Sequence, residues 1–115
     1  PSLEIWFKNA LSKFPNDESV NSSYGQFMNQ RAAGLADKGT GEEDYKKGLS
    51  FIETALQYVA GSVNEASSYY LQSKLYFNLK DYTKANESID KALKIFDRKL
   101  YREQKEKVEK QLSQK

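Results

Sequence analysis

The chain has 115 residues, which suits a single domain, with 38% hydrophobic, 13% aromatic and 30% charged residues and a net charge of +2. It contains no Cys and no His, which excludes disulfide scaffolds, Cys/His zinc sites, thiol nucleophiles, Ser-His-Asp triads and histidine bases. With only two Pro and six Gly, a turn-rich all-β fold is disfavoured.

Apolar side chains recur at helical spacing along the chain, and no segment keeps the period of two that a half-buried strand requires. This spacing predicts six helices, at residues 3–14, 18–38, 42–60, 64–79, 82–96 and 99–113. We therefore predict an all-α fold without strands.

Turn and cap residues mark the predicted helix ends. Pro15 stops the first helix, and the side chain of Asn16 or Asp17 is predicted to cap the second. Two capping boxes and one acidic cap predict the starts of the third, fourth and fifth helices: Thr40 with Glu43, Ser62 with Glu65, and Asp81.

One pattern of large and small apolar residues occurs three times. The residues from Tyr45 to Val59 recur 37 positions later, from Tyr82 to Phe96, and the segment Leu3–Phe14 matches them 45 positions earlier. Small residues keep a fixed phase in these copies, at Gly48 and Ala85 and at Ala10, Ala55 and Ala92. A small residue at a repeated position indicates that a neighbouring helix comes too close for a larger side chain.

The run from Ala66 to Asp97 resembles a tetratricopeptide repeat, a helix-turn-helix unit of about 34 residues. The residues that carry the resemblance are large and small ones at the family's spacing: Tyr69, Ser73, Tyr76, the turn Asp81-Tyr82, Ala85, Ile89 and Ala92. Two positions depart from the family pattern, because Gln72 stands where Leu is usual and Lys80 where Gly is usual. A residue other than Gly at that turn is expected to need a left-handed backbone.

The resemblance implies one domain, residues 1–115, of antiparallel helix-turn-helix repeats in a right-handed superhelix. Residues 1–15 would be the second half of a truncated repeat, 18–60 an irregular repeat, 64–97 a regular repeat, and 98–115 a C-terminal capping helix.

The last helix carries the positive charge of the chain. Residues 98–115 have a net charge of +4 and the other 97 residues a net charge of −2. A capping helix needs a polar outer face, and the pairs Glu103–Lys107 and Glu106–Lys110 are spaced for i,i+4 attraction. A basic patch for nucleic acid or acidic lipid is the alternative. We expect the capping role, with no nucleic acid partner.

The resemblance also implies a non-catalytic scaffold that binds a peptide or partner segment in a concave groove lined by the first helix of each pair. Nine positions would face this groove: Ser22, Gln26, Asn29, Tyr70, Lys74, Phe77, Asn78, Tyr101 and Gln104. Core packing is an equal alternative for Tyr70 and Phe77. Chaperone-binding members clamp a terminal carboxylate with two Lys, an Arg and Asn residues. No such clamp is expected here, because the corresponding positions are Ser22, Gln26, Lys74, Gln104 and Val108.

A second hypothesis makes the chain a C-terminal docking or dimerisation appendage of a larger enzyme. The pattern is faintly similar to the helical repeat tails that follow thioredoxin-like domains in some bacterial proteins. A homo-oligomer would then form through an exposed face of the first helix that contains Trp6 and Phe7.

Catalysis by the chain itself is the least favoured hypothesis. The acidic cluster Glu42, Glu43 and Asp44 lies in a first helical turn, where the helix dipole favours negative charge in any case. We expect no catalytic residue, metal or cofactor.

The sequence does not predict a compartment. No apolar run approaches the length of a bilayer span, so a soluble chain without membrane insertion is expected. The start Pro1-Ser2-Leu3-Glu4 is not a signal peptide and indicates a processed or cloned fragment.

Overall fold

The computed structural model describes residues 2–114, and within that range it contains six α-helices and no strand. The helices are α1 (Ser2–Lys13), α2 (Glu18–Lys38), α3 (Glu42–Leu56), α4 (Val63–Asn78), α5 (Tyr82–Ile95) and α6 (Lys99–Leu112). The all-α prediction is confirmed, and five of the six helices begin and end within one residue of the predicted bounds.

The third helix is shorter than predicted, because it ends at Leu56 instead of residue 60. The chain turns tightly there, with the amides of Tyr58 and Val59 both donating to the Ala55 carbonyl. This turn places Val59, which is only 2% exposed, against α2. The apolar pattern that led to the prediction of a helix up to residue 60 therefore reflects the burial of Val59 in a turn after the helix.

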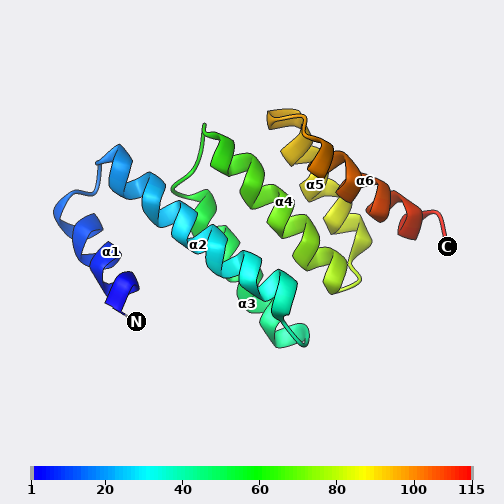
Figure 1. Cartoon of the computed structure of the whole chain (residues 1–115), viewed down its shortest axis with the longest axis horizontal. Coiled ribbons are helices and arrows are strands. Elements are labelled where there is room, and N and C mark those ends of the chain that lie inside the picture. Colours follow the sequence, from blue (N-terminus) through cyan, green and yellow to red (C-terminus); the bar gives the residue numbers. More distant parts are fainter. Residues whose placement is uncertain (1, 115) are drawn as a thin grey trace.

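Consecutive helices run antiparallel, and α2, α4 and α6 lie side by side in one layer with α3 and α5 behind them (Figure 1). Helix α4 occupies the centre, since it packs on α2, α3, α5 and α6. Helix α1 packs on α2 at one end of the molecule, which measures 51 × 29 × 17 Å. This arrangement gives the molecule one open face made by every second helix.

Small residues lie where helices approach one another most closely. Ala55, Ala85 and Ala92 are completely buried, and a Cβ at Gly48 would lie 2.8 Å from Leu75 Cδ2. The fifth repeated small residue, Ala10 in α1, is only partly buried. The repeated small residues thus mark tight contacts in α3 and α5, which have neighbours on several sides.

The predicted caps at Asp17 and Asp81 are confirmed, because their carboxylates accept from the amides of Val20 at 3.0 Å and Lys84 at 3.1 Å. The two capping boxes are wrong in detail. In each loop a carboxylate accepts from the amide four residues before it rather than three: Asp44 from Thr40 at 3.0 Å, and Glu65 from Gly61 at 2.8 Å. The N-cap residues of α3 and α4 are Gly41 and Ser62, and neither makes a side-chain cap bond.

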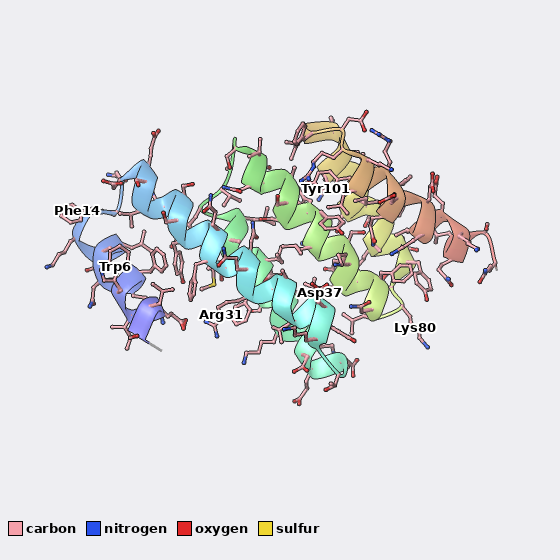
Figure 2. All side chains as sticks on the ribbon, in the orientation of Figure 1. Trp6, Phe14, Arg31, Asp37, Lys80 and Tyr101 are labelled. Atoms are coloured by element: carbon pink, nitrogen blue, oxygen red, sulfur yellow. The ribbon has the colours of Figure 1, made fainter. Side chains whose placement is uncertain are left out.

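The turn between α4 and α5 uses the strained backbone that the sequence predicts. Lys80 has a φ of +64°, and its amide donates to the Phe77 carbonyl while the Asp81 amide donates to the Tyr76 carbonyl. These two bonds form a Schellman motif, in which Gly is the usual residue at the left-handed position. Lys80 lies exposed at this turn (Figure 2), so packing of its side chain does not offset the backbone strain.

Replacing Lys80 with Gly is expected to raise the free energy of unfolding by about 0.5–1 kcal/mol, because Gly adopts the left-handed backbone without a steric penalty. Urea unfolding followed by circular dichroism measures the change. Lys80→Ala is the matched control and should leave stability within about 0.5 kcal/mol, since Ala also carries a Cβ. Equal stability of the Gly and Ala variants would contradict this account of the turn.

Candidate functional site

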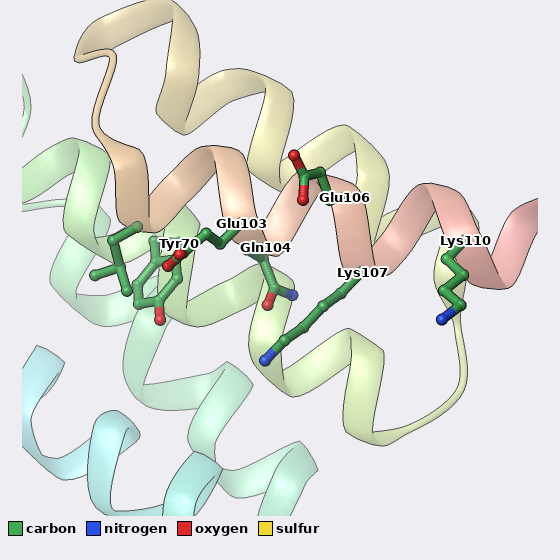
Figure 3. A pocket seen from close by; sticks show the side chains of 7 residues that line it. Tyr70, Glu103, Gln104, Glu106, Lys107 and Lys110 are labelled. Atoms are coloured by element: carbon green, nitrogen blue, oxygen red, sulfur yellow. The ribbon is translucent and has the colours of Figure 1, made fainter.

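The layer of α2, α4 and α6 carries two neighbouring hollows, one on each side of α4. The α2–α4 hollow has a volume of about 290 Å³ and is lined by uncharged side chains: Gln26, Asn29, Gln30, Ala33, Asn64, Ser67 and Leu71. The α4–α6 hollow, of about 480 Å³, has a charged lining (Figure 3): Tyr70, Leu100, Glu103, Gln104, Glu106, Lys107 and Lys110. We call the surface that contains both hollows the α2–α4–α6 face.

The three predicted groove residues of α2 differ in their surroundings. Gln26 is exposed and lines the α2–α4 hollow, whereas Ser22 is half-buried and lines neither hollow. Asn29 lines the same hollow but is 7% exposed, since its Oδ1 accepts from Ser68 Oγ at 2.7 Å and its Nδ2 donates to the Asn64 carbonyl at 3.3 Å. Asn29 therefore joins α2 to α4 and leaves Gln26 as the free amide.

Three of the four predicted groove residues of α4 hold neighbouring elements. Lys74 Nζ lies 2.8 Å from Asp37 Oδ1, and Asn78 Nδ2 donates to the Ala36 carbonyl at 2.9 Å. The Phe77 ring packs edge-on against Tyr82 with a centroid separation of 5.3 Å. Lys74, Phe77 and Asn78 line neither hollow. For Phe77 the structure favours the packing alternative.

Tyr70 is the predicted α4 residue that lines a hollow. Its ring lies 5.1 Å from the Tyr101 ring, centroid to centroid, and Lys74 Nζ lies 5.5 Å from the centroid of the Tyr70 ring. These contacts fix the ring at the edge of the α4–α6 hollow, where it remains half-buried.

The prediction that Tyr101 and Gln104 of α6 face an open groove is corrected by their burial. Tyr101 is 1% exposed and belongs to the core cluster of Ala66, Ile89 and Ala92. Gln104 is 6% exposed, and its amide donates to Ser73 Oγ at 3.1 Å, which in turn donates to the Ala85 carbonyl at 2.8 Å. Both residues point inward because α6 turns this face toward α4 and α5. Gln104 still contributes to the wall of the hollow.

The sequence prediction missed most of the lining. The missed residues are Gln30, Ala33, Asn64, Ser67, Leu71, Leu100, Glu103, Glu106, Lys107 and Lys110. Several lie one helical turn from a predicted position, such as Gln30 after Gln26 and Lys107 after Gln104. Extending each predicted row by three or four residues along the helix is the signal that finds them.

The ion pairs predicted along α6 do not form within residues 2–114. Lys105 instead pairs with Asp90 at 2.8 Å, and Arg102 pairs with Asp97. In Figure 3 the side chains of Lys107 and Lys110 extend toward the side of α6 on which α4 lies, whereas Glu106 points to the other side. The lysines at the α4–α6 hollow thus face it without a carboxylate partner from the described residues.

Helix α1 carries a second exposed surface. Leu3 and Trp6 of α1 and Phe14, which directly follows it, are 53%, 57% and 59% exposed, and we call these three residues the α1 stripe (Trp6 and Phe14 in Figure 2). Phe7, predicted to share this surface, is only 7% exposed, because its ring packs against Tyr24 and Phe27 with centroid separations of 5.5 and 5.3 Å. The prediction of an exposed Phe7 is wrong, since it is the residue that anchors α1 on α2.

The acidic cluster at the start of α3 is engaged in local structure. Glu42 pairs with Lys46 at 3.3 Å, and Asp44 accepts from the Thr40 amide. Among residues 2–114 no three His, Cys, Asp or Glu side chains form a group that could hold a metal ion.

Within the same range no helix is both long and apolar enough to cross a bilayer. No family model matches the chain, nor does any curated protein or solved structure.

Proposed function

We propose that the chain is a short tetratricopeptide-like array that acts as a non-catalytic scaffold and binds an extended peptide on the α2–α4–α6 face. The two neighbouring hollows on this face are the observation that carries the proposal. An extended peptide that crosses α4 can place side chains in both hollows. A ligand that filled one hollow would need only that one.

The packing of the helices supports the repeat assignment. Residues 18–60 supply the pair α2 and α3, and residues 64–97 supply the pair α4 and α5. The first helices of these pairs are neighbours, and α6 continues their row. The tight contacts at Gly48 and Ala85, and at Ala55 and Ala92, occupy equivalent places in the two pairs. A right-handed superhelix and a capping role for residues 98–115 complete the proposal.

The chemistry of the α2–α4 hollow suits a peptide backbone. Gln26 and Gln30 are exposed and their side chains make no hydrogen bond among the described residues. Each amide can donate and accept, which matches the alternating N–H and C=O groups of an extended chain. Asn29 is held rigidly between them by its bonds to α4. The hollow therefore offers polar partners on a fixed floor, with little ordering required on binding.

Peptide selection tests the proposal. The full chain, immobilised through a biotin tag, is used to select 12-residue peptides from a display library, and a selected peptide is then measured by fluorescence anisotropy. The double variant Gln26→Ala/Gln30→Ala is expected to bind about tenfold more weakly, since it loses hydrogen bonds worth about 0.5–1.5 kcal/mol each.

The matched control is Gln57→Ala/Gln114→Ala, which removes two exposed amides away from the face and should bind like the wild type. Failure to select any peptide, or equal binding by both double variants, would contradict the proposal.

The alternative function is a C-terminal docking or dimerisation appendage of a larger bacterial enzyme, such as a thioredoxin-like protein. The exposed apolar side chains of the α1 stripe favour it. Sedimentation velocity of the chain should then show a dimer that Trp6→Lys dissociates. A monomer at every concentration would count against self-association.

A further inference from the structure

The lining of the α4–α6 hollow contains charged side chains, whereas that of the α2–α4 hollow contains none, and this difference bears on which peptides the face accepts. We propose that the α4–α6 hollow receives an acidic side chain from within the bound peptide and pairs it with Lys107 and Lys110. The inference rests on the proposed peptide binding and adds the chemistry of the ligand to it.

The cations of α6 are divided between its two sides. Arg102 and Lys105 are paired with Asp97 and Asp90 respectively, so their charges are already compensated. Lys107 and Lys110 line the α4–α6 hollow and form no ion pair with any residue from 2 to 114. Glu103 and Glu106 line the same hollow and likewise form no ion pair with the described residues, so the charge that an entering side chain meets depends on where these four groups point.

The acidic residues of the same lining do not cancel this charge at the place where a peptide would lie. Lys107 follows the buried Gln104 by three residues, so it lies on the side of α6 nearest to α4. The Glu106 carboxylate points to the opposite side of the helix, and the Glu103 side chain extends toward Tyr70 (Figure 3). An acidic side chain that enters beside Gln104 meets the lysine ammonium groups first.

The neighbouring groups complete a site for such a side chain. The Gln104 carbonyl and amide form the floor, with the amide held by Ser73. Tyr70 provides an aromatic wall whose position is fixed by Tyr101. Leu100, which is 41% exposed, offers an apolar surface for the methylene groups of a Glu or for an adjacent aliphatic residue. The placement of the lysine ammonium groups beside Gln104 thus favours an acidic side chain at this point of the hollow.

The composition of the selected peptides tests this inference. Peptides displayed with a blocked C-terminus and selected on the full chain are expected to be enriched in internal Asp or Glu. A selected peptide, synthesised with an amidated C-terminus, should lose about tenfold in affinity when its acid is changed to the matching amide. It should also bind more weakly as the salt concentration rises.

Variants of the chain assign the effect to the hollow. Lys107→Glu/Lys110→Glu should weaken binding of the acidic peptide at least tenfold, and Lys107→Gln/Lys110→Gln should weaken it less. Lys94→Glu/Lys99→Glu changes the net charge by the same amount at exposed positions outside both hollows and should bind like the wild type. Circular dichroism confirms that each variant is folded.

Three results would overturn the inference. Selected peptides without acidic enrichment that bind through Gln26 and Gln30 would refute it and leave the proposed function intact. An equal effect of the two charge-reversed pairs would show that net charge alone attracts the peptide. Failure to select any peptide would refute the proposed function and the inference together.

Discussion

Replacing Tyr101 with Ala is expected to lower the free energy of unfolding by about 3–5 kcal/mol, the cost of removing a large ring from a packed core. The ring is 1% exposed and packs among Ala66, Ile89 and Ala92. It is the largest fully buried side chain that α6 contributes. Its removal should therefore loosen α6 from α4 and α5, which urea unfolding and amide hydrogen exchange of residues 99–112 both measure.

The matched variant Tyr101→Phe keeps the ring and removes only the hydroxyl. That hydroxyl lies 3.4 Å from Ser67 Oγ, a long contact, so a loss below about 1 kcal/mol is expected. If Tyr101→Ala were as stable as the wild type, the ring would be a surface side chain. It would then again be a candidate contact for the peptide.

Two glycines in α2 are expected to respond to Ala in opposite directions. Gly25→Ala should destabilise the chain by about 1–3 kcal/mol, because the added Cβ would overlap Val59 Cγ1 and lie 3.4 Å from Tyr58 Cβ. Val59 is 2% exposed, so it has little space into which to move.

Gly34→Ala is the matched control within the same helix. No atom lies within 4 Å of its added Cβ, so this variant should be about 0.5–1 kcal/mol more stable, the helix propensity of Ala over Gly. Thermal melting of the two variants measures the difference. A gain in stability for Gly25→Ala would contradict the close approach of α2 to the turn that follows α3.

Helix positions and tight contacts could be predicted from the sequence because they depend on local spacing. The phase of the small residues located Ala85 and Ala92 at buried contacts, and the unusual residue at the turn predicted the left-handed backbone of Lys80. These features require only the period of a helix and the steric needs of a single residue. They do not require knowledge of which helices are neighbours.

The direction of the polar side chains could not be predicted in the same way. Gln72, which stands where the resembled family has Leu, accepts from Ser88 Oγ at 2.8 Å, so α4 and α5 carry a matched polar pair. Gln104 similarly finds Ser73 across 31 residues of sequence. Such bonds depend on the rotation of one helix against another, which periodicity alone does not specify.

The same rotation explains why several residues that line the hollows lie one helical turn from the predicted groove residues. A rotation of α6 that buries Tyr101 and Gln104 places Lys107 at the groove edge. In α4 the bonds of Lys74 to Asp37 and of Asn78 to the Ala36 carbonyl, both in α2, take those side chains out of the lining. The predicted groove residues lie on the helices that line the two hollows, and the prediction misjudged which of those residues remain free.

Backbone amide NMR of the 115-residue chain, titrated with a selected peptide, tests most directly that the α2–α4–α6 face is the binding surface. Chemical-shift changes are expected to follow both hollows, strongest at Gln26, Gln30, Ser67, Tyr70 and Lys107, with the α1 stripe unaffected. Shift changes confined to Leu3, Trp6 and Phe14, or to the outer surfaces of α3 and α5, would contradict it.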